Sequence, residues 1–344
     1  MSARTFKARQ ANAINAFPAS TLPDAELGLS YLAVRSALFI SQPARLDLAQ
    51  SLLVHPTLHR CLLITSLLSI LLSLNNWATV RWRNGTWSVK RLTRKEWAQQ
   101  IVVVTGGSRG MGKSIVDCMI TKGAKVVSLD VLPAQDEAGI GHPTVLINNA
   151  GIQNNRLLID LDDQEIDRML NINLKSHFYT IQAFLPDMIR RGKGHVVLTS
   201  SVMGYVGVSQ MSDYVATKHA LVGLLESLRY ELDKKHRVPK VRTSLVILGH
   251  VRTALFSGAQ FGPLASFLAP TVEAEQVAQE ITAAVERQES THIALPFYAN
   301  LVPWLKVVPT FLRDLAQWMG DADDSMPPPT PNARARARAR SKGE

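Results

Sequence analysis

The chain is 344 residues long and 46% hydrophobic, with a formal net charge of +10 at pH 7. Since single domains seldom grow beyond roughly 250–300 residues, this length indicates one large α/β domain with extensions. The two cysteines, Cys61 and Cys118, lie far apart without C-x-x-C spacing, which excludes a disulfide framework and a cysteine-based zinc site.

The positive charge is not gathered on one folded face. Residues 333–344 alone carry +4 of it, within the repeat ARARARAR. Clustered arginines can bind phosphates, but no aromatic platform accompanies these, so we expect a solvated tail and do not expect nucleic acid as a partner. A second basic cluster lies between Arg81 and Lys95.

Residues 1–98 are expected to form an N-terminal extension. Residues 1–55 carry few periodic signals, although Leu27–Ile40 fits a short helix. Residues 61–80 contain no charged side chain, and a helix of this length would extend about 30 Å, the hydrocarbon thickness of a bilayer. The apolar run ends at Leu74, so a full span, an interfacial or re-entrant helix and a buried core helix all stay open.

The basic cluster follows the C-terminal side of the apolar run 61–80. A secretory signal peptide is not expected, because the run begins far from the N-terminus and lacks a small-residue cleavage site. The segment is predicted to be an uncleaved membrane anchor, and the positive-inside rule leaves the following domain in the cytosol.

Residues 99–295 alternate β-branched runs with amphipathic segments, which is typical of a parallel sheet covered by helices on both faces. The expected strands are Ile101–Thr105, Lys125–Asp130, Thr144–Asn148, His195–Ser200 and Arg242–Leu248. The expected helices are Gly112–Lys122, Asp163–Arg190 and Tyr214–Lys235. The predicted fold class is therefore α/β, with a doubly wound parallel sheet.

Residues 296–320 form an amphipathic segment in which aromatic side chains are mixed with Lys306 and Arg313. Such a mixture suits a membrane interface, and it suits a lid or a dimer surface of the domain equally well. Residues 321–344, with PPPTP before the arginines, have little apolar surface to bury and are expected to be disordered.

A glycine-rich turn joins the first strand to the first helix in IVVVTGGSRGMGKSIVDCMI. Gly106, Gly110 and Gly112 would let the backbone approach a pyrophosphate that faces the helix N-terminus. The second strand ends in Asp130, at the distance expected for an acidic residue that binds the adenosine ribose. A carboxylate accepts hydrogen bonds from a 2′-hydroxyl and repels a 2′-phosphate, which favours NAD over NADP. Arg109 in the turn favours the opposite choice, so NADP stays open.

Three reactive side chains follow the fourth expected strand in TSSVMGYVGVSQMSDYVATKHALVGL. Tyr214 and Lys218 are four residues apart, so they share one face of a helix. A nearby ammonium favours the phenolate that a tyrosine needs for proton transfer to or from an alcohol. The Ser201 hydroxyl can orient the substrate oxygen. This spacing predicts Tyr214 as a catalytic acid/base.

Together these motifs resemble the short-chain dehydrogenase/reductase family over residues 99–260. TGGSRGMG is similar to the cofactor turn of the family, Asn148–Gly151 to its NNAG segment and Tyr214–Lys218 to its Y-x-x-x-K motif. LGHVRT at Leu248–Thr253 is similar to the segment that closes over the nicotinamide, with leucine where proline is usual. The resemblance implies a Rossmann-type fold, hydride transfer at the nicotinamide and no metal.

By this resemblance Asn173 would be a fourth active-site residue, which holds a proton-relay water with Lys218. The cofactor-binding residues that the turn and the resemblance imply are Gly106, Ser108, Arg109, Gly110, Met111, Gly112, Asp130, Asn149, Ala150, Gly151, Tyr214, Lys218, Val251 and Thr253.

The flanking segments are similar, more loosely, to those of membrane-associated retinol and 17β-hydroxysteroid dehydrogenase-like members. The likeness lies in the leading apolar run, the WRNGTW and KEW elements, and the aromatic C-terminal segment. It implies an NAD(P)-dependent oxidoreductase that interconverts a lipophilic alcohol and its carbonyl at the endoplasmic reticulum or a lipid droplet. The expected partners are the lipophilic substrate and the membrane, and a homo-oligomer is compatible with them.

The connection between the second strand and the strand before NNAG is short, since only residues 131–143 are available for it. The family has a helix, an edge strand and a second helix there, and a parallel crossover alone needs about a dozen residues. The third-strand unit is therefore expected to be missing. The second strand would then be an unpaired edge, so the alternative function is a catalytically impaired, membrane-tethered protein that acts through protein contacts.

Overall fold

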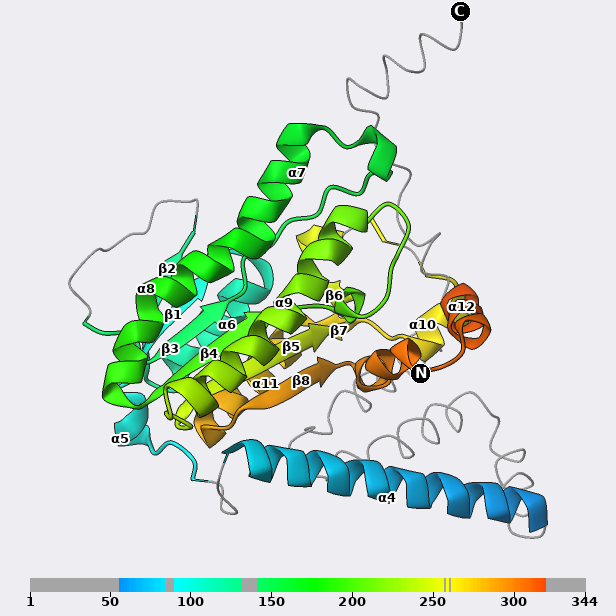
Figure 1. Cartoon of the computed structure of the whole chain (residues 1–344), viewed down its shortest axis with the longest axis horizontal. Helices are drawn as coiled ribbons and strands as arrows, with labels where there is room; N and C mark the ends of the chain where they lie inside the picture. The colour runs from blue at the N-terminus through cyan, green and yellow to red at the C-terminus, as the bar shows by residue number, and fades with distance from the viewer. Residues whose placement is uncertain (1–55, 85–89, 131–140, 257, 260, 320–344) are drawn as a thin grey trace, which may run out of the picture. The chain divides into compact units, whose positions relative to one another are not determined.

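The computed structural model describes residues 56–84, 90–130, 141–256, 258–259 and 261–319 (Figure 1). The expected helix Leu27–Ile40 and the tail 321–344 lie outside the described residues. The chain divides into two compact units between Trp82 and Arg83.

The described part of the first unit is helical. Helix α4 (Pro56–Asn84) is longer than the expected segment 61–80 and runs on into the second unit. Within it, Leu63–Asn84 is long and apolar enough to cross a membrane by length and composition. Its large apolar side chains are exposed, among them Leu67 and Leu71. Such exposure is unusual for a helix of a soluble core and agrees with a lipid-facing helix.

The second unit is built on a six-stranded parallel sheet in the order β2-β1-β3-β4-β5-β8. Its strands are β1 (Ile101–Thr105), β2 (Lys125–Leu129), β3 (Val145–Asn148), β4 (Gly194–Thr199), β5 (Val241–Leu248) and β8 (Thr291–Leu295). The strands β6 (Val251–Arg252) and β7 (Val272–Glu273) form a small separate ladder.

Helices cover both faces of the sheet (Figure 1). The helices of this unit are α5 (Arg94–Trp97), α6 (Gly110–Thr121), α7 (Asp163–Leu170), α8 (Ser176–Arg191), α9 (Ser212–Tyr230), α10 (Pro263–Leu268), α11 (Ala274–Arg287) and α12 (Thr310–Met319). Two π-helical segments, η2 (Asn171–Lys175) and η4 (Glu231–Lys235), adjoin α8 and α9. The short 3-10 turns are η1 (Leu158–Asp160), η3 (Val202–Gly204), η5 (Ala254–Phe256), η6 (Phe297–Asn300) and η7 (Val302–Lys306).

Alternation along β1 divides the hydrophobic core into two layers. Val102 and Val104 pack in a cluster that includes residues of α6 and α11, whereas Val103 packs in a cluster with α8 and α9. Consecutive side chains of a strand point to opposite faces, and a strand buried on both faces reads as a continuous apolar run. The doubly wound α/β fold predicted from the sequence is confirmed.

The five expected strands occur, each with bounds that differ by one residue at most. The expected helix Asp163–Arg190 is interrupted by η2, which divides it into α7 and α8. β8 and α11 were not predicted, because THIAL is a short apolar run before proline and AEQVAQEITAAVER contains few large apolar residues. Small side chains such as Ala278 and Ala284 are nevertheless fully buried there.

Within the described residues, β2 is one edge of the sheet and pairs with β1 alone. Leu129 at its end is 40% exposed, whereas β1 beside it is almost entirely buried. This arrangement agrees with the expectation that the third-strand unit is missing.

Candidate active site

The sequence-predicted site residues lie at the carboxyl ends of β1 to β5, where loops of a parallel α/β sheet bind ligands. The glycine turn leaves β1, Asn149 to Gly151 follow β3, and Ser201 follows β4. Tyr214 and Lys218 reach the same edge from α9, while Val251 and Thr253 follow β5. The fold therefore brings together segments that are about 150 residues apart in the chain.

The turn after β1 is shaped by glycines. Gly106 and Gly110 have φ values of 67° and 52°, a backbone conformation that residues with a Cβ rarely adopt. A Cβ on Gly112 would collide with the Gly106 carbonyl, so the start of α6 packs directly on the turn. No side-chain hydrogen bond caps α6 at Arg109. The first N–H groups of this helix are thus available to a phosphate, as a dinucleotide site requires.

Asp130 lies beside this turn, and its carboxylate accepts a hydrogen bond of 3.1 Å from the Ser108 N–H. The contact joins the end of β2 to the turn and places a negative charge there. The Arg109 side chain lies in the same turn and is exposed to solvent. A charge conflict with a 2′-phosphate would therefore arise at Asp130, while Arg109 is free to turn outward.

A second hydrogen-bonded contact holds the NNAG segment against the glycine turn. The Thr105 hydroxyl accepts hydrogen bonds from the N–H groups of Asn149 at 3.0 Å and Ala150 at 3.1 Å. The Asn149 amide donates to the carbonyls of Thr105 and Gly106 at 3.1 and 3.3 Å. Thr105 was not predicted as a site residue, since a threonine at the end of a strand gives no sequence signal of its own.

Ser201, Tyr214 and Lys218 are all buried at one end of α9. The Ser201 hydroxyl donates to the Leu248 carbonyl at 3.1 Å and is hydrogen-bonded with the Tyr214 hydroxyl. The Lys218 ammonium donates to the Thr199 carbonyl at 2.9 Å and lies 5.3 Å from the centre of the Tyr214 ring. A serine, a tyrosine and a lysine therefore converge where β4 and β5 end.

Burial dominates the electrostatics of this cluster. It raises the pKa of Tyr214 above its usual value, while the hydrogen bond with Ser201 lowers it. Burial also lowers the pKa of Lys218 to about 8. His177 is held neutral, since burial and the charge of Lys218 lower its pKa to about 3. Tyr214 is consequently neutral at pH 7, and the Lys218 ammonium lies 5.3 Å from the centre of its ring.

Asn173 lies in η2 and is completely buried. Its side chain accepts a hydrogen bond from the Ile152 N–H and donates to the Ile152 carbonyl, both at 2.8 Å. A Cβ on Gly151 would lie 3.7 Å from the side-chain oxygen of Asn173 and 3.8 Å from the Lys218 ammonium. The asparagine thus fixes the backbone that passes between the NNAG segment and Lys218.

The segment after β5 closes on the glycine turn. Thr253 lies against Gly110, since a Cβ on that glycine would be 3.8 Å from the threonine methyl group. Val251 is buried in the small β6–β7 ladder, and Met111 packs against the same core cluster. These positions agree with a segment that covers a ligand bound at the turn.

An apolar wall surrounds Tyr214 and was missed in the sequence. Met169 and Met211 form a buried cluster with Tyr214, and the Phe256 ring meets the tyrosine edge-on at 6.0 Å between centroids. Partly buried residues complete it: Ile152, Met203, Val208, Val215, Phe256 and Ala259. They come from separate loops and helices, so no periodic pattern identifies them. The arrangement surrounds the tyrosine ring with apolar side chains.

Within the described residues, no group of three or more His, Cys, Asp or Glu side chains could hold a metal ion.

Known proteins share this combination of fold and motifs. A family model for short chain dehydrogenase matches residues 134–260. Dehydrogenase RED2 of Cochliobolus heterostrophus is 36% identical over 179 residues, which cover 44% of this chain and 68% of that protein. The chain belongs to the short-chain dehydrogenase/reductase family. It is therefore an oxidoreductase of the alcohol dehydrogenase type, with a nicotinamide cofactor.

Two other relatives of this short-chain dehydrogenase extend further along the chain. Short-chain dehydrogenase/reductase family 16C member 6 of Bos taurus is 28% identical over 265 residues, which cover 66% of this chain and 82% of that protein. Epidermal retinol dehydrogenase 2 of Mus musculus is 29% identical over 250 residues, which cover 62% of this chain and 80% of that protein.

Solved structures show the same fold. A short-chain dehydrogenase from Streptomyces avermitilis has a TM-score of 0.51 at 22% identity and covers 64% of this chain and 96% of its own. The aldohexose dehydrogenase of Thermoplasma acidophilum has a TM-score of 0.50 at 22% identity, and the match covers 59% of this chain and 94% of that chain.

Proposed function

We propose that this protein interconverts a lipophilic alcohol and its carbonyl, with Tyr214 as the acid/base and NAD as the preferred cofactor. The convergence of Ser201, Tyr214 and Lys218 beside the glycine turn is the observation that carries this proposal. The retinol dehydrogenase name of one relative supports an alcohol of the retinoid kind as the substrate class.

The residues around the turn fit a dinucleotide. The open N-terminus of α6, with Gly106, Gly110 and Gly112, would hold the pyrophosphate, and Asp130 would bind the adenosine ribose. The remaining contacts would come from Ser108, Arg109, Met111, Asn149, Ala150, Gly151, Val251 and Thr253. When bound, the nicotinamide supplies or accepts the hydride, and it needs the chain only to hold and orient it.

The proton is handled by side chains of the chain itself. In the reducing direction the Tyr214 hydroxyl donates its proton to the carbonyl oxygen of the substrate, and in the oxidising direction the phenolate accepts it. The Lys218 ammonium stabilises that phenolate, because opposite charges within a few ångströms favour the ionised form. Ser201 holds the substrate oxygen next to Tyr214, and Asn173 fixes the backbone from which a relay water reaches Lys218.

The surroundings of Tyr214 support a lipophilic substrate delivered from a membrane. The apolar cluster of Met169, Met211 and Phe256 would bury a hydrocarbon chain. Near it, α12 exposes a face with Phe311 and Trp318, which are 73% and 78% exposed. Side chains of this kind suit the interfacial region of a bilayer.

The C-terminal segment also touches the active-site region. The Gln317 amide donates to the Gly207 carbonyl at 2.6 Å, in the loop that leads from Ser201 to Tyr214. The Lys306 ammonium lies 3.1 Å from a ring nitrogen of His219, the residue after Lys218. Residues 296–320 are therefore proposed as the entry for substrate.

We further propose that 61–80 is the membrane anchor within an N-terminal extension, that 99–295 is the catalytic domain and that 321–344 is a disordered tail. The exposed apolar face of α4 supports the anchor. The basic residues after it support a catalytic domain in the cytosol, at the endoplasmic reticulum or a lipid droplet.

The test is an assay of the full chain in phosphatidylcholine vesicles, with retinol and NAD and with retinaldehyde and NADH. We expect NADH to be formed or consumed, and Ser201→Ala to lower the rate by roughly 10²-fold or more, because the substrate oxygen loses its orienting hydrogen bond. Absence of turnover in both directions with both NAD and NADP would contradict the proposal.

The edge position of β2 favours a second candidate, a catalytically impaired, membrane-tethered protein. An unpaired edge with exposed Leu129 is a surface that another protein can cover. Titration of the full chain with NADH separates the two candidates: nicotinamide fluorescence changes with saturation for the enzyme, and it stays unchanged for a protein that has lost the cofactor site.

A further inference from the structure

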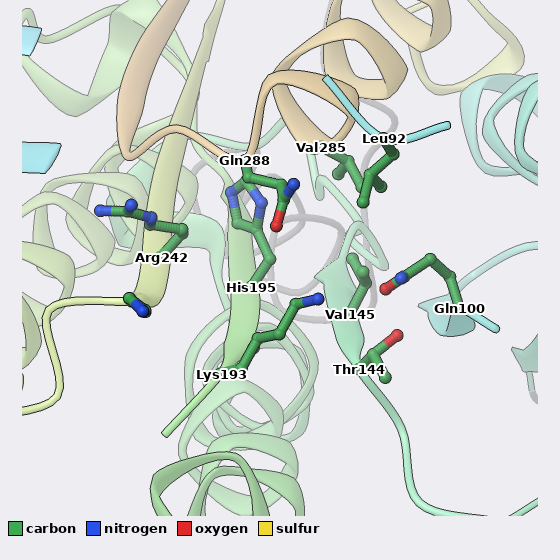
Figure 2. A pocket seen from close by; sticks show the side chains of 11 residues that line it. Leu92, Gln100, Thr144, Val145, Lys193, His195, Arg242, Val285 and Gln288 are labelled. Carbon is green, nitrogen blue, oxygen red and sulfur yellow. The ribbon is translucent and has the colours of Figure 1, made fainter. Parts of the chain in front are cut away.

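A hollow lies at the amino ends of β3, β4 and β5, at the opposite edge of the sheet from Tyr214 (Figure 2). Leu92, Gln100, Lys193, Lys240, Arg242 and Gln288 contribute to its walls. Figure 2 shows the Lys193 ammonium directed into this space, toward the side chains of Gln100 and Gln288. The amide nitrogens of these glutamines donate to the carbonyls of Glu96 and Lys90, at 3.0 and 3.3 Å. Lys193 thus brings an ammonium group to a space that the catalytic reaction does not use.

The hollow carries excess positive charge. Lys193 and Lys240 are exposed, and among the described residues no carboxylate forms an ion pair with either of them. The nearby acids are paired elsewhere: Glu286 with Lys122 at 2.9 Å, Glu289 with Arg287 at 3.2 Å and Asp233 with Arg229 at 2.6 Å. Arg242 is repelled by Arg229 and attracted by Glu289 and Asp233, and His195 adds no charge because burial lowers its pKa to about 3. An anion would therefore be attracted to this space.

The chain enters the second unit beside this hollow. Asn84 pairs with Ser290 through two hydrogen bonds, of 2.6 and 3.1 Å, and its carbonyl accepts one of 3.1 Å from Arg242. The guanidinium accordingly points away from the centre of the hollow in Figure 2.

Residues 90–95 also form part of the wall. The Leu92 N–H donates to the Glu286 carbonyl at 2.8 Å, and the Gln288 amide donates to the Lys90 carbonyl at 3.3 Å. The same segment presents Arg91, Arg94 and Lys95 to solvent. Residues 90–95 thus line the hollow and add cations beside it.

We propose that this hollow binds the phosphate of an anionic phospholipid headgroup. A phosphate accepts hydrogen bonds from ammonium groups and is attracted by the charges of Lys193 and Lys240. The membrane is the favoured source because the hollow adjoins the point where the chain leaves a candidate membrane span, and basic residues next to such spans contact anionic lipid. The site lies apart from the proposed active site and does not depend on catalysis.

The test uses the full chain in detergent micelles, with soluble dihexanoyl phosphatidylserine as the probe. Acylation rates of individual lysines are measured by mass spectrometry with this lipid, with dihexanoyl phosphatidylcholine and with inorganic phosphate. We expect only phosphatidylserine to slow acylation of Lys193 and Lys240, by about fivefold or more, while exposed Lys175 is unaffected. Equal protection by inorganic phosphate would overturn the lipid as the source, and no protection or equal protection of Lys175 would overturn the site.

Variants give a second readout that does not depend on lysine chemistry. Lys193→Gln/Lys240→Gln should weaken phosphatidylserine binding by about 25-fold, at about fivefold for each charge, as measured by the shift of Tm with lipid concentration. Arg168→Gln/Lys175→Gln removes the same charge from exposed positions on α7 and η2 and should leave the shift unchanged. Equal weakening by the two double variants would mean that net charge alone attracts the lipid, which overturns the proposal.

Discussion

At the scale of single residues, the proposed site depends on a few charged side chains that are each held by a hydrogen bond. Asp130 is tied to the glycine turn through Ser108, and Lys218 is tied to Thr199 next to a buried tyrosine. A substitution of Asp130 or of Lys218 removes one charge at a known position, so each contact leads to a measurable prediction.

We expect Asp130→Ala to lower the preference for NAD over NADP by about tenfold or more. The substitution removes the acceptor for the ribose and the repulsion of a 2′-phosphate, and such a repulsion is worth about 4 kcal/mol at 4 Å near a protein surface. The ratio of kcat/KM for the two cofactors is the measurement. Asp130→Asn is the matched control, since it keeps an acceptor for the Ser108 N–H and should also shift the ratio. An unchanged ratio in both variants would reject Asp130 as the ribose-binding residue.

The buried ammonium of Lys218 should lower the free energy of unfolding at pH values at which it is protonated. Its pKa in the folded chain is lowered to about 8 by burial, below the value of an unfolded lysine. Both states are protonated at pH 7, so the cost of the buried charge, on the order of 3 kcal/mol, is fully present there. As pH rises from about 8 to the unfolded pKa, the folded state has lost the proton while the unfolded state keeps it, so stability increases.

Lys218→Met should therefore raise the free energy of unfolding of the cofactor-free chain at pH 7 by about 1–2 kcal/mol, after loss of the hydrogen bond to Thr199. The gain over the unsubstituted chain should shrink as pH rises above 8. Urea unfolding in detergent at several pH values measures it, with Lys175→Met as an exposed control. A variant that is less stable at every pH would contradict the account.

At the scale of elements, the sequence predicts those whose patterns are local. β1 is a continuous valine run before a glycine turn, and the spacing of Tyr214 and Lys218 fixes them on one face of α9. The division of Asp163–Arg190 by η2, which holds the buried Asn173, was not predictable, because hydrophobic periodicity does not reveal a single π-helical turn within a helix. β8 depends on pairing with β5 and on Asn84, which lies 206 positions from Ser290 in the chain.

The cofactor turn and the Ser201, Tyr214 and Lys218 group were predictable because each motif is contiguous or spaced on one helix. Thr105, Phe256 and the methionines around Tyr214 were not, because their roles follow from contacts between distant loops. The apolar wall around Tyr214 is therefore known only from the fold.

Helix α12 provides the prediction at this scale. Phe311→Ala/Trp318→Ala should lower kcat/KM for a lipophilic alcohol delivered in vesicles by about tenfold, because the entry loses its anchoring aromatic groups. Turnover of a short, water-soluble alcohol should not change. Phe178→Ala/Tyr179→Ala, which removes exposed aromatic side chains from α8, is the control. An equal loss for both alcohols would indicate a structural role for α12 instead.

At the scale of the whole molecule, the chain combines a compact α/β unit with a separate apolar helix. The core layers, the sheet and the proposed active site all lie after Arg83, within the second unit. The first unit, which ends at Trp82 within α4, holds none of the described site residues. Membrane attachment and catalysis are thus expected to be separable.

Deletion of residues 1–80 should release most of the protein from membranes and leave the second unit folded. The reason is that the only described helix able to span a membrane, by length and composition, would be lost. Flotation with phosphatidylcholine vesicles, together with circular dichroism of the released fraction, measures both effects. Full retention on the vesicles would assign the anchor to the aromatic segment 296–320.

The most direct test of the central claim is the turnover of Tyr214→Phe. Phenylalanine keeps the ring in its buried cluster and removes the hydroxyl, so stability should fall by only about 1 kcal/mol. Turnover of a lipophilic alcohol should fall by at least about 10²–10⁴-fold, since the proton donor and the contact that orients the substrate are both lost. Affinity for NADH, measured by fluorescence titration, should stay nearly unchanged. Tyr205→Phe, in the loop between Ser201 and Tyr214, should keep normal turnover, and a Tyr214→Phe protein that also does so would contradict the mechanism.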